Sequence, residues 1–318
     1  MKNTNTIYIV GAGAIGKSLA VFLKAAGKQV IIVRGSTNDH EDHVEEIKVQ
    51  LFSGKTITEA VRVTTLGNLD RLADGIIIMT NKSFGNAHLA EKLKLKTTDQ
   101  PVIILQNGLG VEEPFIASGF MQIYRCVLFA TSQTLGPNEI RFKPVSTSPI
   151  GIIKGGESLL NTVVSELHNQ FFVFRAEADI QPIIWTKTIV NCVFNSICPL
   201  LETDNGVFYR NKEVQQIAER LIKECLVIAR ANGIVLSFKN VLSTLLNISK
   251  LSDGQLISTY QDILHHRPTE IETLNFAIVK IADRFNKGRS VNNIRLLGEL
   301  IRYRSEAGYQ PFNIPGTR

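Results

Sequence analysis

The sequence predicts a chain of two parts, an α/β domain over residues 1–176 followed by an all-α domain over residues 177–318. In the first part, short apolar runs alternate with amphipathic segments, which is the pattern of a mostly parallel sheet covered by helices. Beyond Glu177, strand patterns give way to apolar residues at helical spacing, and we place the boundary at that change. A chain of 318 residues is long enough to bury a core in each part.

Composition narrows the class of protein. With 44% hydrophobic and 20% charged residues, the chain has the balance of a soluble globular protein. No uninterrupted apolar run approaches the roughly 18–20 residues of a membrane span, and we expect no signal peptide before the first strand. Four cysteines lie scattered among apolar residues, as reduced core thiols would, so we expect a cytoplasmic protein.

The net charge of +6 does not by itself indicate a nucleic-acid partner. The lysines and arginines are spread along the chain, without a basic run or interleaved aromatic residues. Binding of anionic small molecules explains the positive excess equally well. We therefore expect a small-molecule substrate and neither nucleic acid nor a membrane, with a homodimer left open as the assembly.

A glycine-rich turn follows the first apolar run, Ile7–Val10. The turn consists of Gly11, Ala12, Gly13, Ala14, Ile15 and Gly16. An amphipathic segment and a second apolar run, Val30–Val33, come after it. In this strand–turn–helix–strand context, Gly11 permits the tight turn, Gly13 lets the backbone approach a pyrophosphate, and Gly16 lets the helix pack closely on the strand. The turn therefore predicts a dinucleotide-binding site.

The end of the second apolar run indicates which dinucleotide binds. The run ends in Arg34-Gly35-Ser36, at the place where NAD-binding chains carry an acid for the ribose 2′-hydroxyl. An arginine there suits the 2′-phosphate of NADP instead. A solvent-facing loop arginine is the alternative, but the missing acid independently disfavours NAD. We expect NADP(H) as the cofactor.

Polar residues also follow two later strands. Gly75–Met79 is followed by Lys82, and Val102–Leu105 is followed by Asn107 within a Gln-Asn-Gly-Leu-Gly run. The carboxyl ends of parallel strands form the ligand-binding edge of such a sheet. Lys82 is thus a candidate phosphate or substrate contact, and Asn107 is a candidate contact for cofactor or substrate. An exposed loop lysine and an Asn-Gly turn are the alternatives.

The rest of the first part is expected to hold further strands and one helix. We place strands at Ile47–Phe52 and Val61–Val63, a hairpin of Tyr124–Gln133 with Ile140–Phe142, a strand at Pro149–Ile153, a helix at Ser158–His168 and a strand at Phe171–Phe174. The run His40-Glu41-Asp42-His43 carries side chains of the metal-binding kind. Without further ligands nearby it is expected to be a solvated loop, and we predict no metal site.

The second part is expected to hold six helices. We place them at Ile180–Leu201, Glu213–Asn232, Phe238–Ile248, Gln255–His266, Glu270–Phe285 and Asn293–Ser305. Gly233 is placed to end the second of these as a C-cap. Thr269 is placed to begin the fifth, with Glu272 completing a capping box.

The first of these helices carries a polar stripe. Its segment Ile184–Pro199 is apolar over most of its circumference, yet Lys187, Asn191 and Asn195 interrupt it at intervals of four. Residues four apart lie on one face of a helix, and burying a lysine and two amides costs free energy unless partners pair with them. A solvent-facing stripe is the alternative. Because large apolar residues flank the stripe, we expect it to line a ligand-filled cleft.

Four motifs in order carry a resemblance to a known family. They are G-A-G-A-I-G, Q-N-G-L-G, W-x-K-x-x-x-N-x-x-x-N, and S-x-x-x-D-x-x-x-x-R-P-T-E-I-E-x-L-N from Ser258 to Asn275. Together they resemble the ketopantoate reductase (2-dehydropantoate 2-reductase) family over nearly the whole chain. The resemblance implies a Rossmann domain followed by an all-helical domain, with the site in the cleft between them. It also implies NADPH-dependent reduction of a 2-oxo acid, a step toward pantothenate and coenzyme A.

The resemblance assigns roles to single residues of this chain. Lys187 matches the catalytic lysine of the family, and Glu270 matches the glutamate beside the reacting oxygen. The substrate-contacting positions are matched by Asn107, Asn191, Asn195 and Ser258, and the cofactor-contacting positions by Arg34 and Lys82. By local rules alone, Glu270 would complement a helix dipole and Ser258 would be a surface hydroxyl.

Two places depart from the pattern of the family. Phe276 stands where a glycine is usual, and Gly288–Asn293 lacks the expected proline-containing pattern. In the family this segment lies close to the cleft, so a different 2-oxo acid or a 3-hydroxy acid is an alternative substrate. A non-catalytic NADPH-binding sensor is another alternative. The set of Lys187, Asn191 and Glu270 argues against a sensor, which needs no proton donor.

Overall fold

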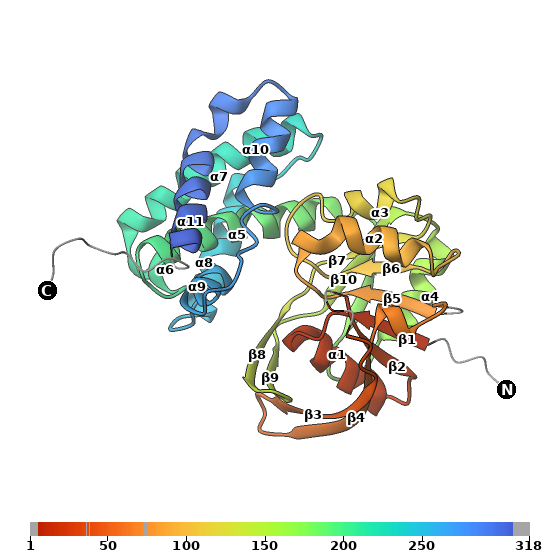
Figure 1. Cartoon of the computed structure of the whole chain (residues 1–318). Helices are drawn as coiled ribbons and strands as arrows, with labels where there is room; N and C mark the ends of the chain where they lie inside the picture. Colours follow the sequence, from red (N-terminus) through yellow and green to blue (C-terminus); the bar gives the residue numbers. More distant parts are fainter. Residues whose placement is uncertain (1–5, 36, 38, 73–74, 308–318) are drawn as a thin grey trace, which may run out of the picture. The chain divides into compact units, whose positions relative to one another are not determined.

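The chain folds into two compact units, an α/β unit and a helical unit (Figure 1). The computed structural model describes residues 6–35, 37, 39–72 and 75–307. The first unit comprises Met1–Gln106 and Val111–Ile180, and the second comprises Asn107–Gly110 and Gln181–Arg318. The predicted fold class, an α/β part followed by a helical part, is confirmed. The division after Ile180 lies slightly beyond the change in composition at Glu177, and a short loop of the first part joins the second unit.

The described strands of the first unit form one sheet of eleven strands, in the order β11-β10-β7-β6-β5-β1-β2-β4-β3-β9-β8. They are β1 (Thr6–Val10), β2 (Val30–Arg34), β3 (His43–Leu51), β4 (Thr56–Thr65), β5 (Gly75–Met79), β6 (Val102–Ile104), β7 (Ile123–Cys126), β8 (Ala130–Gly136), β9 (Glu139–Pro144), β10 (Ser148–Lys154) and β11 (Phe174–Glu177). Strand β1 lies between β2 and β5 and runs parallel to both. The carboxyl ends of these strands therefore meet at one edge.

Helices cover both faces of the parallel strands. They are α1 (Ala14–Ala25), α2 (Asn86–Lys94), α3 (Glu113–Ala117) and α4 (Glu157–Leu167). Alternate residues of β1 point to opposite faces: Ile7 and Ile9 join the apolar core that holds residues of α1 and α4, and Tyr8 and Val10 join the core that holds residues of α2 and α3. Burial on both faces explains why β1 is apolar at every position after its first.

Two sequence predictions in this unit were wrong in part. Tyr124–Gln133 was expected as one arm of a hairpin with Ile140–Phe142, but it contains two strands. Strand β7 lies beside β6 and β10, and only β8, which pairs antiparallel with β9, forms the predicted hairpin. The residues between β7 and β8, Val127–Phe129, are also apolar, so the pattern gave no break. The strand expected at Phe171–Phe174 begins only at Phe174. The backbone N–H groups of Phe171 and Phe172 instead donate to the Asn169 side chain, at 2.9 and 2.8 Å.

The second unit is helical in its described residues. Its helices are α5 (Gln181–Leu200), α6 (Val207–Arg210), α7 (Lys212–Ala231), α8 (Phe238–Leu251), α9 (Ser258–Leu264), α10 (Asn275–Arg284) and α11 (Asn292–Ala307), with a 3₁₀ turn at Gly288–Val291. All six predicted helices are present, and the short α6 was not predicted. Gly233 ends α7 at a φ of +83°, and the Ile234 N–H donates to the Ala229 carbonyl at 2.8 Å, so the predicted C-cap is confirmed.

The predicted capping box at Thr269 was wrong. Helix α10 begins at Asn275, and turns precede it. The N–H of Thr273 donates to the Glu270 carbonyl at 3.1 Å, and the N–H of Leu274 donates to the Ile271 carbonyl at 3.3 Å. These i to i+3 bonds hold Glu270 in a turn outside the helix.

Helix α5 is the core helix of the second unit. Its 20 residues have the length and hydropathy of a membrane span, but 72% of its most apolar window is buried inside the protein. Trp185 and Phe194 are 2% and 1% exposed, and the Phe194 ring packs edge-on against Phe208 at 4.8 Å. The apolar circumference that the sequence showed is thus covered by neighbouring helices.

Candidate active site

The glycine-rich turn is built so that two glycines touch other backbone. Gly11 has a φ of +124°, and a Cβ there would lie 2.6 Å from the Asn81 nitrogen. A Cβ on Gly16 would lie 2.0 Å from the Gly11 carbonyl oxygen. Both positions therefore exclude any side chain, and α1 packs directly on the end of β1.

Gly13 differs from these two because the space beside it is open. No atom lies within 4 Å of the place that a Cβ on Gly13 would occupy. Gly13 is also the N-cap of α1, with no side-chain cap and no acidic residue in the first turn. The N-terminal N–H groups of this helix are thus left to an anion, which the helix dipole favours. The turn fits the pyrophosphate of a dinucleotide, and Ala12, Ala14 and Ile15 are part-exposed beside Gly13.

A network of side-chain amides fixes the sheet edge beside this turn. The Thr80 hydroxyl contacts the carbonyls of Val10 and Gly11 at 3.2 and 3.1 Å, which joins the end of β5 to the end of β1. Gln106 at the end of β6 donates to the Asn81 carbonyl at 2.8 Å and exchanges hydrogen bonds with Asn86 at 2.7 and 2.8 Å.

One atom of this network is left for a ligand or water. The Asn81 side-chain oxygen is buried and has no hydrogen-bond partner among the described residues. Lys82, the predicted cofactor contact, is the next residue and is half-buried. Thr80 and Asn86 were not predicted as site residues. A polar residue at the first position of a helix, as Asn86 is, was the available signal for the latter.

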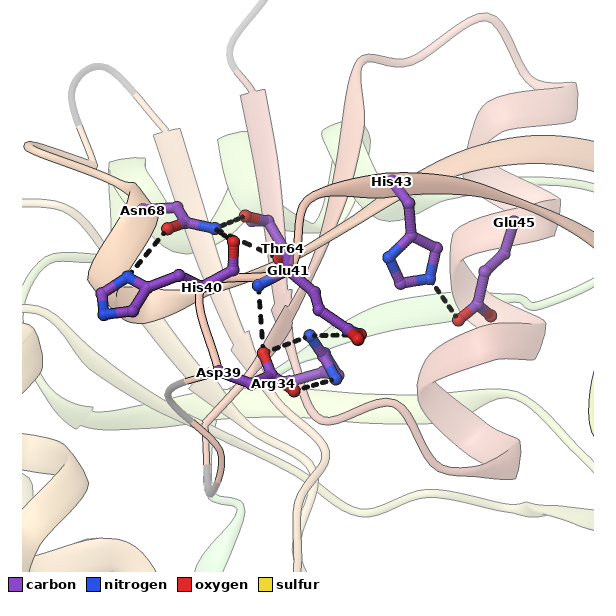
Figure 2. A network of polar contacts seen from close by, with 8 residues as sticks. All are labelled: Arg34, Asp39, His40, Glu41, His43, Glu45, Thr64 and Asn68. Carbon is purple, nitrogen blue, oxygen red and sulfur yellow. Dashed lines mark hydrogen bonds and ion pairs between the residues drawn. The ribbon is translucent and has the colours of Figure 1, made fainter.

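Arg34, the predicted 2′-phosphate contact, lies at the end of β2 and is held by acids (Figure 2). Its two terminal nitrogens donate to both carboxylate oxygens of Asp39, at 2.8 and 2.7 Å, and Glu41 lies 3.3 Å away. Chiefly the backbone N–H of Glu41, and then the Arg34 guanidinium, hold the pKa of Asp39 below its ordinary value of 3.8. No acid directly follows the end of β2 in the sequence, yet the following loop brings the carboxylates of Asp39 and Glu41 to Arg34. Ser36 lies outside the described residues.

The rest of the run His40-Glu41-Asp42-His43 is paired rather than merely solvated. Asp42 binds Arg62 on β4, at 2.9 and 2.5 Å, and the His43 ring lies 3.1 Å from Glu45. His43 begins β3 instead of belonging to the loop. Among the described residues, no three His, Cys, Asp or Glu side chains gather in a way that could hold a metal ion.

The polar stripe of α5 is directed partly into the helical unit. Lys187 and Asn191 are half-buried, whereas Asn195 is only 1% exposed. The Asn195 amide nitrogen donates to the Asn191 carbonyl at 2.9 Å. Its oxygen accepts the Thr259 N–H at 3.2 Å and lies 3.4 Å from the Ser258 hydroxyl. Asn195 thereby holds the first turn of α9, and the structure brings Asn195 and Ser258 together.

Asn107 and Glu270 lie on two loops that are joined to each other. The Asn107–Gly110 loop belongs to the second unit, where the Leu109 N–H donates to the Thr273 carbonyl at 2.9 Å. Gly108 has a φ of +95°, and a Cβ there would lie 2.2 Å from the same carbonyl. The Thr273 N–H and hydroxyl donate in turn to the Glu270 carbonyl, at 3.1 and 3.2 Å. All six predicted catalytic and substrate-binding residues therefore belong to one unit: Asn107, Lys187, Asn191, Asn195, Ser258 and Glu270.

Two buried polar residues that the sequence analysis did not single out support these loops. Arg125, 2% exposed, forms an ion pair with Glu112 and donates to the Gln106 carbonyl at 3.2 Å, which fixes the base of the Asn107 loop. Asn275, fully buried, donates to Ser196 on α5 at 2.8 Å and to the Ile294 carbonyl on α11 at 3.1 Å. Asn275 stood in the quoted motif, so the motif contained a structural residue as well as candidate site residues.

The cysteines take no part in this site. All four are free and buried, as predicted: Cys126, Cys192, Cys198 and Cys225. Burial raises the pKa of the Cys198 thiol to about 12, and the neighbouring Cys192 with burial raises the pKa of Cys225 well above its ordinary value. Cys198 and Cys225 therefore remain neutral thiols at physiological pH, and neither is a reactive nucleophile.

Comparison with known proteins agrees with this arrangement. The family model for ketopantoate reductase PanE/ApbA matches residues 7–154, and the model for its C-terminal domain matches residues 179–303. A 2-dehydropantoate 2-reductase of Pyrococcus horikoshii is 27% identical over 308 residues, which is 95% of this chain and 98% of that protein.

Solved structures share the fold. A D-mandelate dehydrogenase solved with NADH and anilino(oxo)acetate has a TM-score of 0.82 at 20% identity, covering 96% of this chain and 99% of its own. A dimeric ketopantoate reductase from Staphylococcus aureus has a TM-score of 0.79 at 20% identity, covering 95% and 99%. The two family models lie one on each part of the chain, with the glycine-rich turn in the first and the Lys187 helix in the second. The chain belongs to the ketopantoate reductase family of dinucleotide-binding oxidoreductases.

Proposed function

We propose that this protein reduces a 2-oxo acid to the 2-hydroxy acid with NADPH, and that 2-dehydropantoate is its substrate. The observation that carries the proposal is the placement of Lys187, half-buried on the core helix α5, in the same compact unit as Asn107 and Glu270. A half-buried ammonium on an otherwise apolar helix suits the binding of a small anion and the transfer of a proton to it.

In this proposal one part of the chain binds the nucleotide and the other binds the substrate. Residues 1–176 bind the nucleotide through the turn at Gly11–Gly16, with Arg34 at the 2′-phosphate and Lys82 at a second phosphate contact. Residues 177–318, joined by Asn107, supply the substrate contacts and the proton donor. The open space at Gly13 and the uncapped start of α1 support the first assignment.

The proposed chemistry follows from the charge that develops on the substrate. When bound, the reduced nicotinamide supplies the hydride that reaches the carbonyl carbon of the 2-oxo acid. As that C–H bond forms, the π electrons of the carbonyl move to its oxygen. The Lys187 ammonium stabilises the negative charge and transfers a proton to this oxygen, which completes the hydroxyl.

The neighbouring residues orient the reacting groups. Glu270 accepts a hydrogen bond from the new hydroxyl and orients the Lys187 ammonium. Asn107, Asn191 and Ser258 hold the carboxylate and hydroxyl of the substrate so that the reacting oxygen stays at Lys187. Asn195 belongs to this substrate set through Ser258, which it contacts at 3.4 Å.

A different 2-oxo acid is a second candidate substrate, favoured by Phe276. The Phe276 ring occupies a position where the family usually has glycine, and the Arg302 guanidinium stacks on it at 3.8 Å while also pairing with Glu272. The Phe276 ring and the stacked guanidinium take up more space than a glycine would at this position. The D-mandelate dehydrogenase neighbour was solved with anilino(oxo)acetate, an aromatic oxo acid derivative. This neighbour supports testing aromatic 2-oxo acids.

The experiment follows the loss of NADPH absorbance in the purified protein with 2-dehydropantoate and with a panel of aliphatic and aromatic 2-oxo acids. Rapid oxidation with 2-dehydropantoate supports the first candidate, and selective oxidation with another member supports the second. If NADPH binds but no 2-oxo acid is reduced, the proposed reaction is wrong. Oxidation of 3-hydroxy acids with NADP⁺, measured in the same series, tests the remaining alternative.

We also propose a homodimer in the cytoplasm. The S. aureus relative is dimeric, and four buried free cysteines suit a reducing compartment. Light scattering during size-exclusion chromatography gives the mass of the assembly, and the 35.3 kDa mass of one chain would contradict the dimer.

A further inference from the structure

The guanidinium proposed to bind the 2′-phosphate is already occupied by carboxylates (Figure 2). Asp39 binds both terminal nitrogens of Arg34 in the bidentate manner, and Glu41 lies 3.3 Å from one of them. One positive and two negative groups leave the cluster of Arg34, Asp39 and Glu41 with a net charge of −1, since +1 − 2 = −1. An approaching anion therefore meets a negative cluster instead of a free cation.

The loop that carries these carboxylates is anchored from a different part of the sheet. Asn68, in the 3₁₀ turn after β4, donates through its amide nitrogen to the carbonyls of His40 and Glu41, at 3.0 and 3.1 Å. The Asn68 oxygen also lies 3.2 Å from the His40 ring, and His40 adopts a left-handed φ of +57°. The Glu41 N–H donates to Asp39 at 3.1 Å. These bonds hold Asp39 and Glu41 beside Arg34 as part of the fold.

We infer that Asp39, aided by Glu41, determines cofactor specificity by competing with the nucleotide 2′-phosphate for Arg34, which narrows the preference for NADPH over NADH. The inference rests on the proposed function of the glycine-rich turn as a dinucleotide site. An arginine alone at this position would favour NADPH strongly over NADH. Asp39 and Glu41 reduce this difference in affinity.

The competition follows from the geometry of arginine. A guanidinium fork binds a carboxylate or a phosphate through the same nitrogens, and the Nε of Arg34, which has no partner among the described residues, is buried, so a 2′-phosphate at the terminal nitrogens competes with Asp39. The phosphate carries a charge of about −1.5 to −2 and would then lie beside two displaced carboxylates. The 2′-hydroxyl of NADH is uncharged and can donate to a carboxylate, which Asp39 offers without moving. Ion pairs near the protein surface are weak, because water and salt screen them. Displacement is therefore feasible, and NADPH still binds.

The test measures the dissociation constants of NADPH and NADH for the purified protein by calorimetry, without any substrate. Asp39→Asn should tighten NADPH binding about 3- to 10-fold, because one competing charge is removed while the arginine stays. Binding of NADH should change less than about two-fold. Glu41→Gln should give a smaller gain for NADPH, since Glu41 lies farther from the guanidinium. Asn68→Ala, which releases the loop, should reproduce part of the Asp39→Asn gain.

Asp42→Asn is the matched control. Asp42 forms the same kind of exposed ion pair three residues further on, but with Arg62 on β4. Its substitution should leave both dissociation constants unchanged, and thermal melts should show all variants folded. Arg34→Ala should weaken NADPH at least about 10-fold and leave NADH nearly unaffected.

Two different results overturn two different claims. If NADPH binds to the wild type and neither Asp39→Asn nor Asn68→Ala tightens it, the competition is wrong while the dinucleotide site stands. If the wild type binds neither nucleotide, the proposed function fails and the inference fails with it.

Discussion

The glycine-rich turn presents backbone groups, whereas the polar stripe of α5 presents side chains. In the turn, a side chain at Gly11 or Gly16 would clash with backbone atoms, and the first N–H groups of α1 have no side-chain cap, which suits the binding of an anion. The stripe uses side chains: Lys187, Asn191 and Asn195 lie on a core helix, and Asn195 is bonded to α9. The turn depends on the absence of side chains at a few neighbouring positions, whereas the stripe depends on hydrogen-bond partners that are distant in the sequence.

This difference predicts how each region responds to substitution. At Gly11 and Gly16 of the turn, an added side chain should disturb folding and nucleotide binding together, because there is no room for it. In the stripe, folding and chemistry should separate, because Asn195 is bonded to α9, whereas Lys187 and Asn191 are the more exposed residues that we propose to act on substrate.

The largest effect is expected at Gly16. Gly16→Val places a Cβ about where the Gly11 carbonyl oxygen lies, so α1 must move away from β1. We expect a loss of at least about 3 kcal/mol in the free energy of unfolding, measured by urea titration, and loss of nucleotide binding. Gly13→Ala is the control, because the space there is open: it should fold normally and weaken only nucleotide binding. Normal stability of Gly16→Val would show that the turn is not packed as described.

A smaller effect is expected at Asn195. Asn195→Ala removes the acceptor of the Thr259 N–H, whose residue is 2% exposed, and should lower the free energy of unfolding by about 1–3 kcal/mol. Asn247, an exposed asparagine on α8, provides the control, and Asn247→Ala should leave stability unchanged or slightly raised. If Asn195→Ala abolishes turnover at full stability, Asn195 acts on substrate and not on α9.

The smallest effect is a pH dependence in the first unit. Lys17, 9% exposed on α1, binds Glu45 at 2.6 Å as well as the Asn138 side chain and the Pro137 carbonyl. Burial alone would raise the pKa of Glu45, but the hydrogen bonds from Lys17 and His43 outweigh it and hold this pKa below its ordinary value of 4.5. The pair therefore stabilises the fold above pH 4.5, and the contribution is lost as the pH falls through the lowered pKa.

Unfolding titrations of Lys17→Met test this linkage. The variant should be less stable than the wild type at neutral pH by about 1–2 kcal/mol, and the difference should shrink as the pH falls below 4.5. Lys24→Met, at an exposed position of the same helix, should show no such trend. A difference that stays constant with pH would place the effect in packing rather than in the ion pair.

Most of the helices and strands could be predicted from the sequence, but fewer of the side-chain contacts could. The spacing of Gly11, Gly13 and Gly16 was sufficient to predict the turn, because glycine spacing and strand context define its geometry. The break between β7 and β8 was missed, because apolar residues continue through Val127–Phe129 with no turn residue. The start of α10 was misplaced because Thr269 and Glu272 satisfy a local rule that the turns at Glu270–Leu274 override.

Hydrogen bonds and ion pairs between residues that are distant in the sequence could not be predicted from local sequence patterns. Arg34 predicted a phosphate contact, but no spacing rule shows that Asp39 and Glu41 return to it, since Asn68 holds that loop from beyond β4. The bond of Leu109 to Thr273, which joins the Asn107 and Glu270 loops, connects residues more than 160 positions apart. Such contacts come from tertiary packing, which sequence periodicity does not encode.

The central claim is that one part of the chain binds nucleotide while Lys187 in the other supplies the proton. The most direct test measures NADPH affinity and 2-oxo acid turnover side by side for the wild type and Lys187→Ala, with Lys250→Ala as an exposed-lysine control. We predict that Lys187→Ala keeps its NADPH affinity within about two-fold while kcat falls by about 10²–10⁴, and that the control matches the wild type. Turnover by Lys187→Ala at the wild-type rate would contradict the claim.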